Sequence, residues 1–193
     1  LVGSVMCIRD RDIIVCSYIT QIASITGQGS GPNGWFTLNQ ANVYFDHPFH
    51  APLDHAVTVD FVNPDLGPSA RVAIELSADS AERLMHLIDA NILECAPTNS
   101  ATLEATKDQE ADNAHVKLFG SGKGSTGWSS LDKAIVYNSV DKANDQTIHI
   151  DFLSKQSSDN NRYISIDITT DSAESISRSI DAALENGRRE HIL

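Results

Sequence analysis

The chain contains the same pattern twice, and this duplication constrains its fold more than any other feature. Gly27–Gly31 followed by Trp35 returns 93 positions later as Gly120–Gly124 followed by Trp128. Three further stretches recur at offsets of 91 to 93: Ala41–Tyr44 as Ala134–Tyr137, Val59–Phe61 as Ile150–Phe152, and Asp79–Glu82 as Asp171–Glu174. Because both copies must fold, the shared positions are those that the fold requires. A residue type present in one copy alone is free to carry function.

The hydrophobic pattern predicts four strands in each copy. Apolar and polar residues alternate along 42–47, 57–61 and 71–76 in the first copy and along 148–152 and 164–168 in the second. This period of two is typical of strands with one buried face. A β-branched run predicts a further strand over 13–26, and the glycine-rich stretch 27–34 after it is interpreted as a turn.

A helix follows the strands in each copy. Asp79–Glu82 and Asp171–Glu174 fit the capping box, in which an N-cap acceptor precedes a glutamate by three residues. Apolar residues then recur at helical spacing, at Ala81, Leu84, Ile88 and Ile92 in the first copy and at Ala173, Ile176, Ile180 and Leu184 in the second. We therefore predict an α+β fold of two tandem ββββα repeats, each an antiparallel sheet covered on one face by its C-terminal helix. One such unit is close to the smallest size that forms a stable core, so we expect the repeats to pack together as a pseudo-dimer.

The duplication also sets the expected domain boundaries. Residues 11–95 form the first repeat, the polar and acidic residues 96–113 form a linker, and residues 114–190 form the second repeat. Residues 1–10 have no counterpart in either copy and resemble the read-through translation of a transposon adapter used to build sequencing libraries. We interpret them as a sequencing-adapter artefact and expect their deletion to leave the thermal midpoint unchanged.

The charge of the chain excludes two classes of partner. The formal net charge is −12, whereas nucleic acids and anionic membrane surfaces need clustered lysine and arginine. No apolar run approaches the roughly 20 residues that span a bilayer. Cys16 and Cys95 are isolated in the sequence, which favours a reducing compartment, and we expect a cytoplasmic protein.

Five stretches of the first copy form a specific pattern: Cys16–Thr20, Gly34–Phe36, Ala41–Pro48, His50–His55 and Arg71–Ser77. In this pattern residues 15–95 resemble a family of short, uncharacterised bacterial single-domain proteins. The resemblance implies a domain that begins near Val15, and it implies no known activity. Residues 114–190 fit the same pattern more loosely, as a degenerate copy without the histidine segment.

The segment 46–55 carries three histidines and two aspartates within ten residues. His47, His50 and His55 can supply three nitrogens to a zinc-like divalent metal, with a neighbouring aspartate orienting one imidazole. We expect His50 to matter most for binding and little for folding, because it lies between two prolines that fix its direction.

Two other interpretations of this segment stay open. Without a metal, a histidine beside an aspartate can act as a general acid or base. Alternatively, the segment is a turn stiffened by Pro48 and Pro52, with histidines that bond backbone carbonyls. The second copy has no histidine in the corresponding stretch 138–146, so the fold does not require the cluster.

A second group of candidates shares the polar face of the predicted sheet. Tyr44, Asp60, Arg71 and Glu75 alternate with the buried residues of three strands, and we predict that they bind a ligand. The simpler explanation is an ion pair across neighbouring strands. His86, His115, His149 and His191 are isolated in the sequence and receive no predicted role.

These observations support two classes of function. The first is a small-molecule or metal-binding module with its site in the N-terminal repeat, and whether it is an enzyme stays open. The second is a non-catalytic interaction or structural protein whose repeats form the pseudo-dimer. The expected partner is accordingly a small molecule or another protein.

Overall fold

The computed structural model describes residues 19–31, 33–95, 115–124, 127–140, 146–154, 162–190 and 193. The first repeat contains β1 (Gln21–Gly31), β2 (Gly34–Asp46), β3 (Ala56–Val62), the 3-10 helix η1 (Pro64–Leu66), β4 (Arg71–Leu76) and α1 (Ala78–Cys95). The second contains β5 (His115–Gly124), β6 (Gly127–Val140), β7 (Gln146–Leu153), β8 (Arg162–Thr169) and α2 (Thr170–Arg189). Each repeat thus has four strands followed by a helix, in the predicted order.

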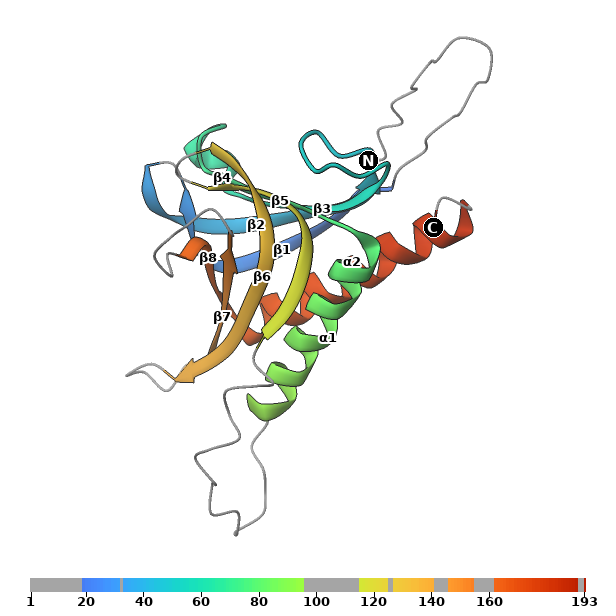
Figure 1. Ribbon diagram of the computed structural model, residues 1–193. Helices are drawn as coiled ribbons and strands as arrows, with labels where there is room; N and C mark the ends of the chain where they lie inside the picture. Colours follow the sequence, from blue (N-terminus) through green and yellow to red (C-terminus); the bar gives the residue numbers. More distant parts are fainter. Residues whose placement is uncertain are drawn as a thin grey trace.

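The eight strands form one closed antiparallel barrel, so the prediction of two separate sheets packed as a pseudo-dimer is wrong (Figure 1). Each strand pairs with the next one along the chain, and β8 pairs with β1. The last strand of each repeat therefore pairs with the first strand of the other repeat, β4 with β5 and β8 with β1. An open edge leaves a row of backbone N–H and C=O groups unpaired, and closure of the barrel removes all four edges. The two repeats share one hydrogen-bonded sheet.

The repeated glycines make these two junctions possible. The glycine-rich stretches lie inside β1 and β5, so the predicted turn over 27–34 is wrong for most of its length. A Cβ on Gly27 would lie 2.1 Å from the backbone oxygen of Asp167, and a Cβ on Gly120 would lie 2.0 Å from that of Glu75. Only glycine allows these strands to approach the neighbouring repeat so closely.

One buried serine connects each helix to the other repeat. β1 and β5 each carry a bulge, which takes local N–H groups out of the ladder. Ser172 Oγ, at the start of α2, accepts a hydrogen bond of 2.8 Å from the Thr26 N–H of β1. Ser80 Oγ, at the start of α1, accepts one of 2.9 Å from the Phe119 N–H of β5. The hydroxyls thereby satisfy donors that the bulges leave without a strand partner.

Both helices begin before the predicted capping boxes. The N-cap acceptors are Ser77 and Thr169, two residues before the predicted Asp79 and Asp171. Each hydroxyl accepts a hydrogen bond of 3.3 Å from the N–H three residues later. The two aspartates lie in the first turn instead, where a carboxylate interacts favourably with the helix dipole.

The two helices lie on the same side of the barrel and pack against each other (Figure 1). Arg188 near the end of α2 donates to Glu82 near the start of α1 at 3.0 Å, and Ser177 donates to Asp89. The order of these contacts shows that α1 and α2 run antiparallel.

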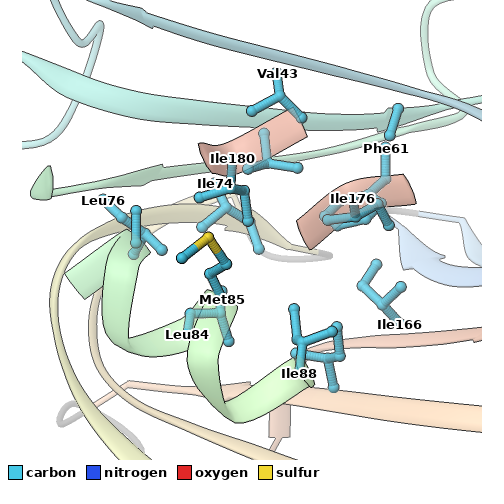
Figure 2. Close-up of a cluster of buried hydrophobic side chains, with 14 of the residues drawn as sticks. Val43, Phe61, Ile74, Leu76, Leu84, Met85, Ile88, Ile166, Ile176 and Ile180 are labelled. Carbon is cyan, nitrogen blue, oxygen red and sulfur yellow. The ribbon is translucent and has the colours of Figure 1, made fainter. Parts of the chain in front are cut away.

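The apolar faces of the helices pack against the inward side of the strands. They form one buried cluster with the strand residues, which includes Val43, Phe61, Ile74, Leu76, Leu84, Met85, Ile88, Ile166, Ile176 and Ile180 (Figure 2). Burial of one side chain of this size stabilises the fold by roughly 1.5–3 kcal/mol. An eight-stranded barrel is just wide enough for side chains to fill it. The predicted ligand-binding residues Tyr44, Asp60, Arg71 and Glu75 alternate with the inward-facing apolar residues along their strands. They therefore lie on the outer face of the sheet.

Two predicted segments cannot be placed. Residues 1–10 and the predicted linker 96–113 lie outside the described residues. Among the described helices, none combines the length and apolar composition that a membrane crossing requires.

Candidate functional site

The histidine segment forms the loop between β2 and β3, and Glu75 holds this loop against the sheet. The N–H groups of Phe49, His50 and Ala51 donate to the Glu75 carboxylate at 2.8, 2.9 and 2.7 Å. Glu75 lies on β4 opposite Thr58 of β3 and has no exposed surface. Hydrogen bonds to a carboxylate are stronger than those between neutral groups. Glu75, a predicted ligand-binding residue, therefore anchors the loop.

His50 extends from this loop to the second repeat. Its ring stacks on Trp128 of β6, with 4.1 Å between the ring centroids and 27° between the planes. The loop of one repeat thus covers a tryptophan of the other. Trp35, the equivalent of Trp128 in the first repeat, is 52% exposed.

His47 and His55, at the two ends of the loop, lie beside each other. Their ring centroids are 4.4 Å apart, and His55 also stacks on Phe45 at 5.8 Å. Asp46 Oδ1 lies 3.1 Å from His47 Nδ1 and orients this ring. Burial, and secondarily the neighbouring His47, lowers the pKa of His55.

These two histidines line an open cleft of about 660 Å³. Its lining consists of Phe45, His47, Pro48, Leu53, Asp54, His55, Ala78 and Leu193. The lining combines two imidazoles and one carboxylate with apolar side chains. We call this feature the histidine cleft.

The three predicted metal ligands do not converge on one point. The structure brings His47 and His55 together, whereas His50 lies on Trp128 and does not line the cleft. Among the described residues, no group of three or more His, Cys, Asp or Glu side chains is placed to hold a metal ion. The expectation that His50 matters most for binding does not match this position.

The other predicted ligand-binding residues share one outer face of β2, β3 and β4, and two of them are paired. Arg71 Nη2 donates to both carboxylate oxygens of Asp60, at 2.7 and 2.9 Å, and Arg71 Nε donates at 3.0 Å. Burial raises the pKa of Asp60, and Arg71 opposes this shift. Burial and the nearby Asp60 raise the pKa of Tyr44 to about 12. Arg71 also lines a groove of about 300 Å³ next to η1.

The model of a family of unknown function, DUF6295, matches the chain in two segments, residues 15–102 and 112–192. The chain belongs to DUF6295. Each matched segment contains one ββββα repeat, which is consistent with tandem copies of the family domain. No curated protein and no solved structure matches the chain.

The structure of this DUF6295 protein also reveals a group that the sequence analysis missed. His149, which receives no predicted role, lies on the outer face of β7 between Ser139 of β6 and Asp167 of β8. These residues are 10 and 18 positions from His149 in the chain. Strand alternation alone places His149 and Asp167 at outward positions. Pairing the predicted strands 148–152 and 164–168 would have indicated that these two side chains are neighbours.

Proposed function

We propose that this DUF6295 protein binds a small neutral or cationic molecule in the histidine cleft. The observation that supports this function is the pair of adjacent imidazoles, His47 and His55, at an open cleft with an otherwise largely apolar lining. Ligand sites are usually concave, mostly apolar and roughly 300–1,000 Å³ in volume, with a few polar groups that orient the ligand. All described lining residues except Leu193 belong to the N-terminal repeat, and five of them lie in the loop between β2 and β3, whose counterpart in the second repeat has no histidine.

The charge of the lining restricts the ligand. Because burial lowers the pKa of His55, this imidazole is neutral near pH 7 and can accept a hydrogen bond at one ring nitrogen. Asp54 adds a carboxylate, and among the described residues no lysine or arginine lines the cleft. A ligand with a hydrogen-bond donor or an ammonium group would find acceptors here, and its apolar part would contact Phe45 and Leu53.

A zinc-like divalent ion is the second candidate for the same cleft. The adjacent rings of His47 and His55 can supply two nitrogen ligands, and Asp46 orients the first of them. The remaining ligands would have to come from the bound molecule or from water.

The experiment compares three probes on the full chain: phenethylamine, 3-phenylpropionate and Zn²⁺ alone. The two organic probes have the same apolar part and opposite charges. We expect phenethylamine to shift the imidazole ¹⁵N resonances of His47 and His55, and 3-phenylpropionate to leave them unchanged. Binding constants from calorimetry should weaken at least tenfold in His55→Asn, whereas His50→Asn is the matched control because its ring lies outside the cleft.

The outcomes separate the alternatives. Binding of Zn²⁺ without binding of the amine supports the metal. Tighter binding of the carboxylate contradicts the argument from charge. If none of the probes shifts His47 or His55, or if His50→Asn weakens binding as much as His55→Asn, the cleft is not the site and the interaction function gains support.

A further inference from the structure

A hydrogen-bonded chain of serine, histidine and aspartate lies on the second repeat, apart from the histidine cleft. Ser139 Oγ is 2.7 Å from His149 Nε2, and Asp167 Oδ1 is 2.6 Å from His149 Nδ1. The serine and the aspartate thus contact opposite nitrogens of one imidazole. This connectivity allows the histidine to accept the serine proton while the carboxylate holds the ring.

The register of the barrel fixes these positions. His149 is paired with Tyr137 of β6 and with Asp167 of β8, and Ser139 lies two residues beyond Tyr137. The neighbouring residues Ile148 and Ile168 are buried in the core, so the four polar side chains lie on the outer face. The Tyr137 ring stacks on the imidazole with 4.8 Å between centroids and 11° between planes. His149 is therefore held by its ring face and by both nitrogens.

The fold does not require this chain of residues. The equivalent positions of the first repeat are Asp46, Thr58 and Glu75, at offsets of 93, 91 and 92. The stacked tyrosine recurs as Tyr44, at the same position in the ladder. Ser139, His149 and Asp167 all differ from their equivalents in the first repeat, whereas the supporting tyrosine is the same. The group therefore belongs to the second repeat alone and is not part of the shared framework.

The group of Ser139, His149 and Asp167 is also accessible to a reactant. The His149 side chain is 20% exposed and that of Asp167 is 34% exposed. Ser139 is half-buried. A hydroxyl within hydrogen-bond reach of an imidazole that a third group orients is the arrangement of an activated nucleophile.

We propose that Ser139 is an activated nucleophile and that the second repeat hydrolyses carboxylic esters. Ser139 Oγ attacks the ester carbonyl carbon, and its proton moves to His149 Nε2. The bond between this carbon and the alkoxy oxygen breaks, and the leaving alcohol takes the proton from His149. Water then attacks the acyl-serine, again with His149 as the base, which releases the acid and restores Ser139. Asp167 is a positioning residue, because it acts through Nδ1 and keeps Nε2 free to accept the proton.

The test is covalent labelling of the full chain with an alkyl fluorophosphonate, in which the serine oxygen replaces fluoride at phosphorus. We expect one label, mapped to Ser139 by peptide mass spectrometry, and slow release of p-nitrophenol from p-nitrophenyl acetate. Ser139→Ala should abolish the label. His149→Asn should slow labelling about 100-fold, within the usual contribution of a general base. Ser130→Ala is the matched control, since Ser130 is an exposed serine of the same strand, and it should label like the unmodified protein.

Asp167→Asn separates positioning from a structural role. We expect slower labelling together with a changed ¹⁵N shift pattern of His149, because an amide can present N–H to Nδ1 and reverse the tautomer. Asp167→Glu should restore part of the labelling rate. Labelling of the unmodified protein at another residue, an unlabelled Ser139, or a rate that is unchanged in folded His149→Asn would overturn the proposal.

Discussion

At the scale of single residues, the tightest constraint in this protein is the contact between two backbones. Gly27 and Gly120 recur because a side chain at either position would meet a carbonyl oxygen of the other repeat at about 2 Å. A backbone atom in a paired strand cannot move aside cheaply, unlike the end of a flexible side chain. The motif that is most visible in the sequence therefore serves the closure of the barrel.

Gly120→Ala should lower the free energy of unfolding by about 1–3 kcal/mol or more, because its Cβ would overlap the Glu75 oxygen. Urea denaturation measures this change. Gly29→Ala is the control, since its Cβ would meet only side-chain methyls at 3.3 Å or more. Equal losses in the two variants would show that the backbone contact does not set the cost.

Tyr44 is expected to ionise later than an ordinary tyrosine. Burial and Asp60 raise its pKa to about 12, so the folded state favours the neutral phenol. The associated stability is present below pH 10 and is lost as the pH rises from 10 to 12. Absorbance at 295 nm should show a late titration step that Tyr44→Phe removes. A titration of the unmodified protein that is complete by pH 11 while the protein stays folded would contradict this prediction.

At the scale of elements, the loop between β2 and β3 joins the two repeats. Glu75 binds three of its N–H groups, and His50 stacks on Trp128 of the other repeat. In the second repeat only five residues, 141–145, separate β6 from β7. The histidines of this loop are therefore a property of the first repeat alone.

Glu75→Gln should release the loop. An amide offers one oxygen where the carboxylate offers two, so at least one of the three N–H groups loses its acceptor, at a cost of about 1–3 kcal/mol. In a Trp35→Phe background Trp128 is the single tryptophan, and its emission should change when His50 leaves it. Glu82→Gln removes only a surface ion pair and should change stability by less than about 1 kcal/mol. Unchanged emission and stability in Glu75→Gln would show that the loop is held by other contacts.

At the scale of the whole molecule, the barrel is one cooperative unit made of two similar halves. The junctions β4–β5 and β8–β1 and the antiparallel helix pair all connect one repeat to the other. Neither half closes its own sheet.

We therefore expect a single unfolding transition. Trp35 reports on the first repeat and Trp128 on the second, so Trp128→Phe and Trp35→Phe isolate the two signals. In each single-tryptophan variant, the urea midpoint from fluorescence should coincide with the urea midpoint from circular dichroism. A fluorescence midpoint that differs from the circular dichroism midpoint of the same variant would show that the repeats unfold independently.

The sequence by itself determined the duplication, the order of four strands and a helix, and the face of each element that is buried. Periodicities of 2 and 3.6 residues are local properties, so Val59 and Ile176 were recognisable as core residues from their neighbours alone. Tyr44, Asp60, Arg71 and Glu75 were placed on one polar face for the same reason.

Tertiary structure alone decided which strand pairs with which, and this pairing determined the positions of the candidate site residues. Alternation does not identify the partner of an edge strand, so β4 could have remained an edge instead of pairing with β5. The closed barrel brought Glu75 under the loop and His50 onto Trp128, and it left His47 and His55 at the cleft. Ser139, His149 and Asp167 became neighbours because three strands align in register, a relation between distant segments that no local pattern contains.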